Sequence, residues 1–227
     1  AAGVLRGLDR ILADEPSIDA RLAVPVKRIE RLERFGFRCL RPAPIPLPLS
    51  VQRRLVVDQR LPPMDLVLGA GTYFFPNFWR WPLRRSRVVT AVHDISFEVM
   101  PEFADAANGA FLRREVRHSV TTSDAVTALT STTADEIAAW YAVPRDRISV
   151  VGCAVDRARF YRRSPQEIAR VTRAHGIWGE YVISVGNIEP RKNQVRLIDA
   201  FCALPREVTA GVTLVLVGAG AWNEGEI

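Results

Sequence analysis

The feature that most constrains the fold is an alternation of short apolar runs with amphipathic helical segments. Apolar runs at 87–92, 125–129, 147–151, 181–185 and 212–217 alternate with helical patterns at 107–119, 131–141, 165–175 and 193–204. Runs that are apolar throughout are typical of strands buried on both faces, as in a parallel sheet covered by helices. The alternation therefore predicts an α/β fold with parallel sheets.

The first part of the chain is less regular. Apolar spacing predicts helices at 4–12 and 26–35, and short strands are expected at 18–24, 37–40 and 65–69. Four prolines fall within the ten residues 41–50, and each fixes φ and lacks an N–H, so this stretch is predicted to be an extended loop. Thr132 or Thr133 is expected to cap the helix at 131–141.

A domain boundary is expected in the segment 152–163, which joins two series of strands and helices. It predicts a first lobe at 1–155 and a second at 156–227, two Rossmann-like lobes with a cleft between them. Parallel sheets bind their ligands at the carboxyl ends of the strands. We therefore expect ligand-binding residues directly after the apolar runs.

The most informative stretch is 181–201, YVISVGNIEPRKNQVRLIDAF. A buried strand ends at Gly186, a short polar loop carries Arg191 and Lys192, and Asn193 can cap the helix that follows. Two cations beside the positive end of a helix suit a diphosphate. The alternative is a solvated charged turn that only caps a helix.

Charge and cysteine content exclude several classes of function. The net charge is +6, but arginines alternate with Asp and Glu along the chain, whereas a nucleic-acid footprint clusters its cations, so we expect no nucleic acid partner. Three widely spaced cysteines and three histidines show no metal-ligand spacing, and no apolar run is long enough to span a membrane. A reduced, cytoplasmic setting is the default expectation.

The order of several motifs resembles glycosyltransferase family 4 (group 1), in particular its mannosyltransferase-like branch. The PRKN loop with its LI-AF helix at 190–201 resembles the donor-binding segment of that family. The other matching stretches are 88–97 with its VHD core and Pro101, 129–137, 141–160, and 214–218 with Ala221 and Trp222. The resemblance covers residues 65 to 227.

The resemblance implies a GT-B fold, with an acceptor-side lobe at 1–155 whose first strand is missing and a partial donor lobe at 156–227. It also implies transfer of a sugar, mannose, from a nucleotide-diphosphate sugar such as GDP-mannose to a saccharide or lipid-linked acceptor in polysaccharide biosynthesis. Retention of configuration and the absence of a metal or cofactor are further implications.

The resemblance also assigns roles to residues of the second lobe. Lys192 is expected to hold the donor diphosphate, and Arg191 to support the loop. Many relatives carry an arginine where Asn187 stands, so one phosphate cation is missing here, although the mannosyltransferase-like branch often lacks it too. Gly186 is expected to let the backbone approach the donor, and Gly218 to do the same, unless Gly218 only forms a turn.

In the first lobe, His93 is expected to lie near the transferred sugar, where an imidazole can hydrogen-bond a hydroxyl or the departing phosphate. The alternative is a structural histidine held by Asp94. The aromatic stretch 74–81 is expected to form a loop at the edge of the cleft that packs on the core, with stacking on a sugar or a peripheral contact at the inner face of the membrane as alternatives.

Departures from the family pattern leave other functions open. The paired glutamates of the family, E-x7-E, do not occur before Ile227, and the glycine-rich first loop is represented only by Ala1, Ala2 and Gly3. We therefore expect a truncated chain that is inactive by itself, or alternatively a degenerate module that binds a nucleotide sugar or a partner subunit without turnover. A dinucleotide-dependent oxidoreductase is a third, strongly disfavoured class, because Gly218 and Gly220 lack the required glycine spacing.

Overall fold

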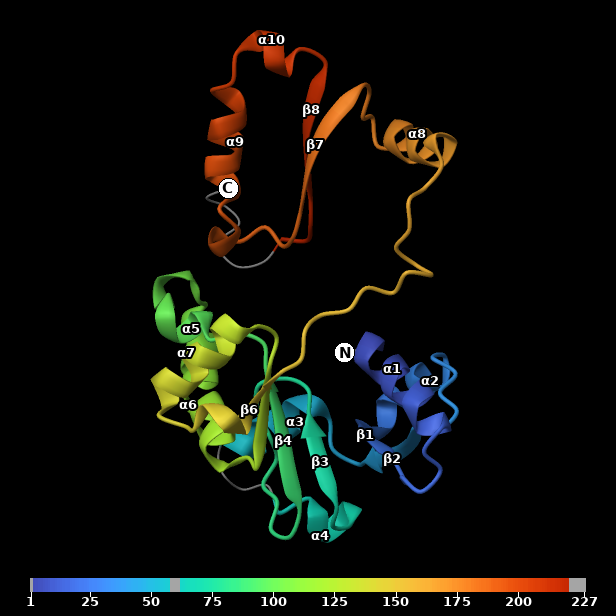
Figure 1. Cartoon of the computed structure of the whole chain (residues 1–227), viewed down its shortest axis with the longest axis vertical. Helices are drawn as coiled ribbons and strands as arrows, with labels where there is room; N and C mark the ends of the chain where they lie inside the picture. Colours follow the sequence, from blue (N-terminus) through green and yellow to red (C-terminus); the bar gives the residue numbers. More distant parts are fainter. Residues whose placement is uncertain (1, 58–61, 221–227) are drawn as a thin grey trace. The chain divides into compact units, whose positions relative to one another are not determined.

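The structure is a computed structural model that describes residues 2–57 and 62–220. The chain forms two compact units (Figure 1). Unit 1 comprises Ala1–Val99 and Ala107–Ala154, and unit 2 comprises Met100–Ala106 and Val155–Ile227. Each unit contains parallel strands connected by helices, so the predicted α/β class is confirmed. The acceptor-side and donor-side roles of the two lobes stay predictions.

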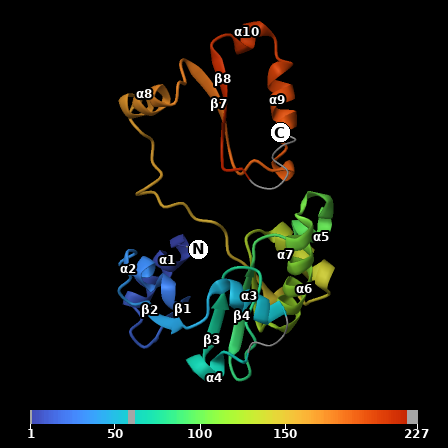
Figure 2. The ribbon, with the colours of Figure 1, turned by 180° about the vertical axis from the view of Figure 1, so that it is seen from behind.

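A four-stranded parallel sheet organises unit 1. Its order is β3 (Thr72–Phe75), β4 (Arg87–Val92), β5 (Ala125–Ala128) and β6 (Ile148–Val150). The predicted strands at 87–92, 125–129 and 147–151 are therefore confirmed, whereas β3 was not predicted. The helices α6 (Ala106–Thr122) and α7 (Ser131–Tyr141) lie alongside this sheet (Figure 1), and Figure 2 shows the same unit from behind with α3 (Leu49–Val57) in the foreground.

Apolar side chains of the sheet and of the two long helices make the core of unit 1. These side chains are almost fully buried because the strands and helices each turn an apolar face inward. They are Val88, Val92, Val126 and Ile148 from the strands and Val116, Val120 and Ile137 from the helices. This core fixes the carboxyl end of β4, and His93, the predicted site residue of the first lobe, follows directly after it.

The N-terminal part of unit 1 holds a second, two-stranded parallel sheet. It pairs β1 (Arg21–Pro25) with β2 (Arg41–Ile45), and it is accompanied by α1 (Ala2–Ala13), η1 (Val26–Arg28) and α2 (Ile29–Glu33). The predicted helices at 4–12 and 26–35 are thus confirmed. Gly3, the expected remnant of a glycine-rich loop, lies within α1.

The prediction of an extended loop at 41–50 and of a strand at 37–40 was wrong, because β2 itself lies in the proline-rich stretch. Pro42 and Pro44 alternate with residues whose N–H groups face β1, and the Arg41 N–H donates to the Ala20 carbonyl at 3.1 Å. The missing proline donors therefore fall on the other edge of β2, where they leave the ladder intact.

Two further local predictions were wrong. The apolar run at 65–69 forms a short helix, α4 (Asp65–Leu68), and the Asp65 carboxylate accepts hydrogen bonds from the Arg84 and Arg85 N–H groups and the Ser86 hydroxyl. So short an apolar run does not distinguish a strand from a helix. The cap of α7 is Thr130, whose side chain accepts the Thr133 N–H at 3.1 Å.

Unit 2 contains a two-stranded parallel sheet, β7 (Glu180–Val185) beside β8 (Val212–Val217). Figure 1 shows α8 (Pro165–Ala174) on the side of β7 and α9 (Gln194–Cys202) on the side of β8. Two short elements, η4 (Pro190–Lys192) and α10 (Arg206–Thr209), flank α9. The predicted strands at 181–185 and 212–217 and the helices at 165–175 and 193–204 are confirmed. Ala221 and Trp222 lie outside the described residues.

The remaining short elements are α5 (Ser96–Val99), η2 (Pro101–Phe103) and η3 (Arg145–Arg147). Among the residues that the structure describes, no helix combines the length and the apolar character that crossing a membrane requires.

Candidate functional site

The carboxyl ends of β7 and β8 meet at Gly186 and Gly218. The Gly186 N–H donates to the Val217 carbonyl at 2.9 Å, and the Ile188 N–H donates to the Ala219 carbonyl at 3.0 Å. A Cβ atom on Gly218 would overlap the carbonyl oxygen of Gly186 and lie 2.7 Å from its carbonyl carbon. Gly218 therefore permits two backbone segments to approach each other closely. The alternative expected from the sequence, that Gly218 only forms a turn, does not explain this contact.

The side chain of Lys192 returns to the end of β7. A Cβ atom on Gly186 would lie 3.8 Å from Cε of Lys192 and 3.9 Å from its Cδ, so the lysine stem runs over the Gly186 backbone. Lys192 is exposed. Its ammonium group is thus attached to a stem that packs where the strand stops, at the end of a parallel sheet where ligands bind.

The second cation of the loop has a different environment. The Arg191 guanidinium donates to the Glu189 carboxylate at 2.8 Å, and the Glu189 side chain is 11% exposed. Lys192 has no salt bridge in the described part of unit 2. The ion pair with Glu189 allows Arg191 to stabilise the turn of η4. The charge of Lys192 is left available to bind an anion.

The start of α9 is held by a buried glutamine. Gln194 is 4% exposed, and its Nε2 donates to the Asn187 carbonyl at 2.8 Å, which fixes the turn after Gly186. Asn193 stands at the N-cap position but makes no side-chain capping bond, because η4 leads it into a left-handed conformation with φ of 57°. The expected capping by the Asn193 side chain is therefore wrong, and the Gln194 bond takes over the ordering of the loop.

His93 follows β4 directly, in unit 1, and is half-buried. Its ring meets the Phe78 ring edge-on, with 5.1 Å between centroids and planes at 88°. The Asp94 carboxylate instead accepts the Ser96 N–H at 3.0 Å and the Ser96 hydroxyl at 2.7 Å. Within the described residues, the alternative of a histidine held by Asp94 thus finds no hydrogen bond to support it.

Sequence reasoning missed Phe78 as a neighbour of His93. Phe78 has φ of 62°, which is unusual for a bulky residue, and its N–H donates to the Ala91 carbonyl of β4 at 2.9 Å. The aromatic stretch 74–81 packs on the core as expected, since Trp79 and Trp81 contact the cluster around Ile45 and Met64. The run of aromatic residues six to thirteen positions before the strand at 87–92 was the available signal.

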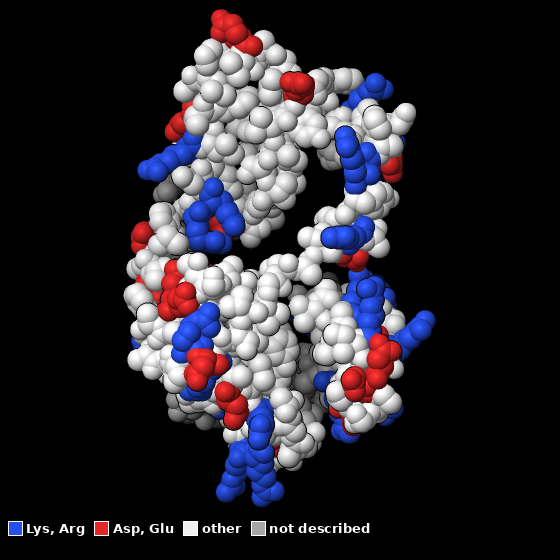
Figure 3. Space-filling model, viewed as in Figure 1, with Lys and Arg blue, Asp and Glu red and all other residues white. Residues whose placement is uncertain are grey.

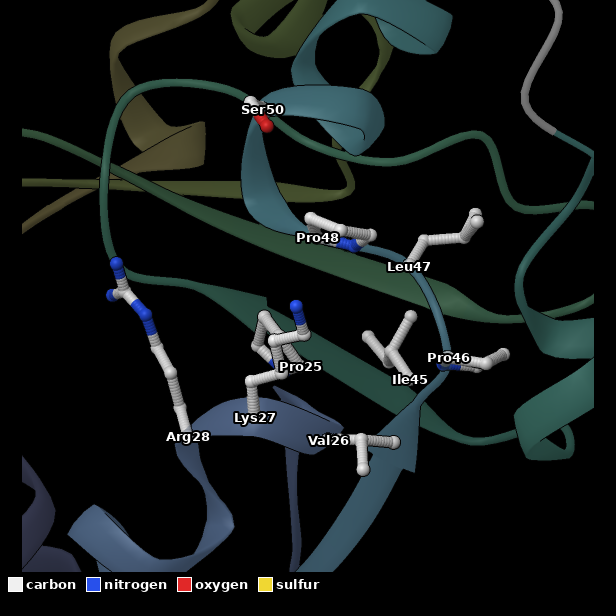
Figure 4. A pocket seen from close by; sticks show the side chains of 9 residues that line it. All are labelled: Pro25, Val26, Lys27, Arg28, Ile45, Pro46, Leu47, Pro48 and Ser50. Atoms are coloured by element: carbon white, nitrogen blue, oxygen red, sulfur yellow. The ribbon is translucent and has the colours of Figure 1, made fainter.

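A cavity of about 880 Å³ opens at the carboxyl ends of β1 and β2 (Figure 4). Lys27 and Arg28 of η1 and Ser50 of α3 are the polar side chains of its lining, and Pro25, Ile45 and Leu47 belong to its apolar part. The cavity lies within unit 1 and contains none of the site residues predicted from the sequence.

Charges are mixed over most of the face shown in Figure 3, where Lys and Arg side chains are interspersed with Asp and Glu. This face shows no single-sign stripe of the kind that nucleic-acid binding proteins present, and the absence of a nucleic acid partner stays a prediction. Among the described residues, no group of three or more His, Cys, Asp and Glu side chains is arranged to hold a metal ion.

Comparison of the fold defines the class of protein. Over 90% of this chain, the structure is similar to 55% of the Anabaena protein Alr3699/HepE, solved in complex with UDP, with a TM-score of 0.53 and 17% sequence identity. The fold is α/β of the GT-B type.

Residues 10–159 match Glycosyltransferase Family 4, and the chain belongs to this family. It is also 30% identical over 155 residues to the O-antigen chain mannosyltransferase B of Escherichia coli. The match covers 67% of this chain and 40% of that protein.

Proposed function

We propose that the protein transfers mannose from GDP-mannose to a saccharide or lipid-linked acceptor, with retention of configuration and without a metal. Membership of glycosyltransferase family 4 supports sugar transfer as the reaction class. The choice of mannose draws on the likeness to an O-antigen chain mannosyltransferase, and the choice of a nucleotide-diphosphate donor draws on the UDP in the HepE complex.

The observation that carries the donor site is the packing of the Lys192 stem over Gly186, beside an arginine that Glu189 already neutralises. We assign Lys192 to the donor diphosphate. The free N–H groups at the start of α9 add to the positive potential at the same loop. As the sugar–phosphate bond breaks, negative charge grows on the departing diphosphate, and a fixed cation stabilises that charge.

We assign His93 to the transferred sugar or the departing phosphate. Its position after β4 and the edge-on contact with Phe78 restrict the orientation of the imidazole. An imidazole nitrogen can donate a hydrogen bond to a hydroxyl or a phosphate oxygen, which orients the sugar without a covalent step. A contact with the membrane stays a prediction.

The donor assignment is tested by calorimetric titration of GDP into the wild-type chain and the Lys192→Ala variant. Loss of one charge-assisted hydrogen bond to a phosphate costs about 1.5–3 kcal/mol, so affinity should fall about 10- to 100-fold. Arg170→Ala removes an exposed cation of α8 in the same unit and should leave affinity unchanged. Equal affinity of the wild-type chain and Lys192→Ala would refute the assignment.

Two further readouts separate the finer parts of the proposal. Tighter binding of GDP than of UDP is expected if the donor is GDP-mannose, and the reverse preference would contradict that donor. Incubation with GDP-mannose and a saccharide acceptor, followed by NMR of the product, reports turnover and anomeric configuration. Nucleotide binding without any turnover would favour the non-catalytic module.

A further inference from the structure

The cavity at β1 and β2 has the location of a ligand site in a parallel sheet. The two strands end in register, with Pro25 opposite Ile45, and the segments that follow each strand supply the remaining lining. After β1 the lining comes from η1, and after β2 it comes from residues 46–48 and Ser50. Ligands of open α/β sheets bind at such carboxyl ends.

The walls of this cavity are apolar and stiff. Pro25, Pro46 and Pro48 have fixed φ angles and carry no N–H, so much of the wall offers no backbone donor. Ile45, 1% exposed, and Leu47 add apolar surface and pack with the cluster that includes Met64. A polar ligand therefore finds its partners chiefly among three side chains, those of Lys27, Arg28 and Ser50.

The charge of the lining is positive and uncompensated. None of the lining residues is Asp or Glu, and neither Lys27 nor Arg28 forms a salt bridge within the part of the chain that the structure describes. Figure 4 shows both cationic side chains extending to the same side of η1, towards the segment that carries Pro48 and Ser50. The arrangement combines two cations and a hydroxyl with an apolar wall.

Lysine usage gives an independent indication. Of the 31 Lys and Arg residues, only Lys27 and Lys192 are lysines. Both stand in a short 3-10 turn after a parallel strand, Lys27 in η1 after β1 and Lys192 in η4 after β7. On a solvated surface the two cations replace each other at little cost, whereas a compact ammonium with three rotatable donors suits a phosphate as a point charge.

We infer that this cavity binds a phosphate group carried on an apolar chain, the group through which a lipid-linked acceptor holds its sugar. The inference rests on the proposed function and narrows its acceptor to the lipid-linked class. Lys27 and Arg28 contact the phosphate oxygens, Ser50 donates its hydroxyl, and the proline wall contacts the first part of the apolar chain. The site is distinct from the donor loop, the segment 186–193 that is proposed to hold the donor diphosphate and that carries the other lysine.

The two lysines make the test direct. A sample labelled with [ε-13C]lysine gives one NMR signal for Lys27 and one for Lys192, and Lys192→Gln leaves the Lys27 signal alone. Farnesyl diphosphate should move that signal in the Lys192→Gln chain, and inorganic pyrophosphate should bind at least 10-fold more weakly. Farnesol, which lacks the phosphate, should leave the signal in place.

Matched variants extend the test to affinity. In the Lys192→Gln chain, Lys27→Gln should weaken farnesyl diphosphate at least 10-fold by calorimetry, and Arg10→Gln, an exposed cation of α1, should not. An unmoved Lys27 signal, or unchanged affinity in Lys27→Gln, would overturn the site. Equal affinities for pyrophosphate and farnesyl diphosphate would overturn the lipid-linked source. GDP binding in a chain that keeps Lys192 tests the donor proposal separately.

Discussion

At the scale of single residues, the loop at 186–193, which we propose holds the donor diphosphate, depends on two glycines, and each is a glycine for a different reason. Gly218 lies so close to the Gly186 carbonyl that no side chain fits, whereas a Cβ on Gly186 would meet only the stem of Lys192 at ordinary contact distance. Gly218 therefore allows the two strand ends to lie together. Gly186 allows the stem of Lys192 to pack close to the backbone.

Gly218→Ala and Gly186→Ala should accordingly differ. Gly218→Ala forces the two strand ends apart and should destabilise unit 2 by about 1–3 kcal/mol, the range of overpacking. Gly186→Ala should change stability by less than about 1 kcal/mol, since a flexible side chain can give way. Urea unfolding followed through unit 2 tryptophan and tyrosine signals measures both, and similar losses in the two variants would contradict the packing described here.

At the scale of elements, long periodic segments were predicted well and short ones were not. The strand at 87–92 and the helix at 131–141 are found with the predicted bounds. The strand is apolar over a full buried face, and the helix repeats its apolar pattern over several turns. The run at 65–69 became a helix because Asp65 binds backbone N–H groups twenty residues away, and β2 formed in spite of its prolines because only one of its edges is paired. Both outcomes depend on tertiary partners that local spacing does not contain.

The candidate site follows the same division. Lys192, Arg191 and both glycines of the loop were predicted and lie together in unit 2. The Gln194 bond and the Phe78 contact were not predicted, because each depends on how a loop folds back on a strand end. The cavity beside Lys27 was missed for the same reason, although the scarcity of lysine was visible in the sequence.

The contact of α7 with α5 gives a pH-dependent prediction. Tyr141 of α7 is 4% exposed and donates its hydroxyl to the Glu98 carboxylate of α5 at 3.1 Å. Burial, and then the charge of Glu98, raise the pKa of Tyr141 above its ordinary value, with the Arg117 guanidinium acting in the opposite direction. The neutral phenol is therefore favoured in the folded state.

Above a pH of about 10, Tyr141 ionises in the unfolded chain but keeps its proton in the folded chain. The free energy of unfolding therefore falls as the pH rises. Tyr141→Phe removes the titratable hydroxyl. The slope with which the unfolding free energy falls should therefore decrease by up to about 1.4 kcal/mol per pH unit. Urea unfolding of both chains between pH 8 and 11 measures the difference. Parallel curves would contradict the raised pKa of Tyr141.

At the scale of the whole molecule, the chain consists of two units, and the proposed sites are divided between them. Unit 1 holds His93 and the cavity with Lys27, and unit 2 holds the donor loop with Lys192. The chain spans 40% of the E. coli relative and 55% of HepE, so the activity of the whole enzyme is a proposal that rests on both units. The donor loop is the central claim, since the assignment of a nucleotide-diphosphate donor depends on it.

Titration of GDP into the wild-type chain labelled with [ε-13C]lysine tests that claim most directly, since only two lysine signals have to be followed. The account predicts that the signal lost in Lys192→Gln moves with GDP and saturates at the calorimetric affinity, while the Lys27 signal stays in place. GDP binding that leaves the Lys192 signal unmoved, or moves the Lys27 signal instead, would contradict it.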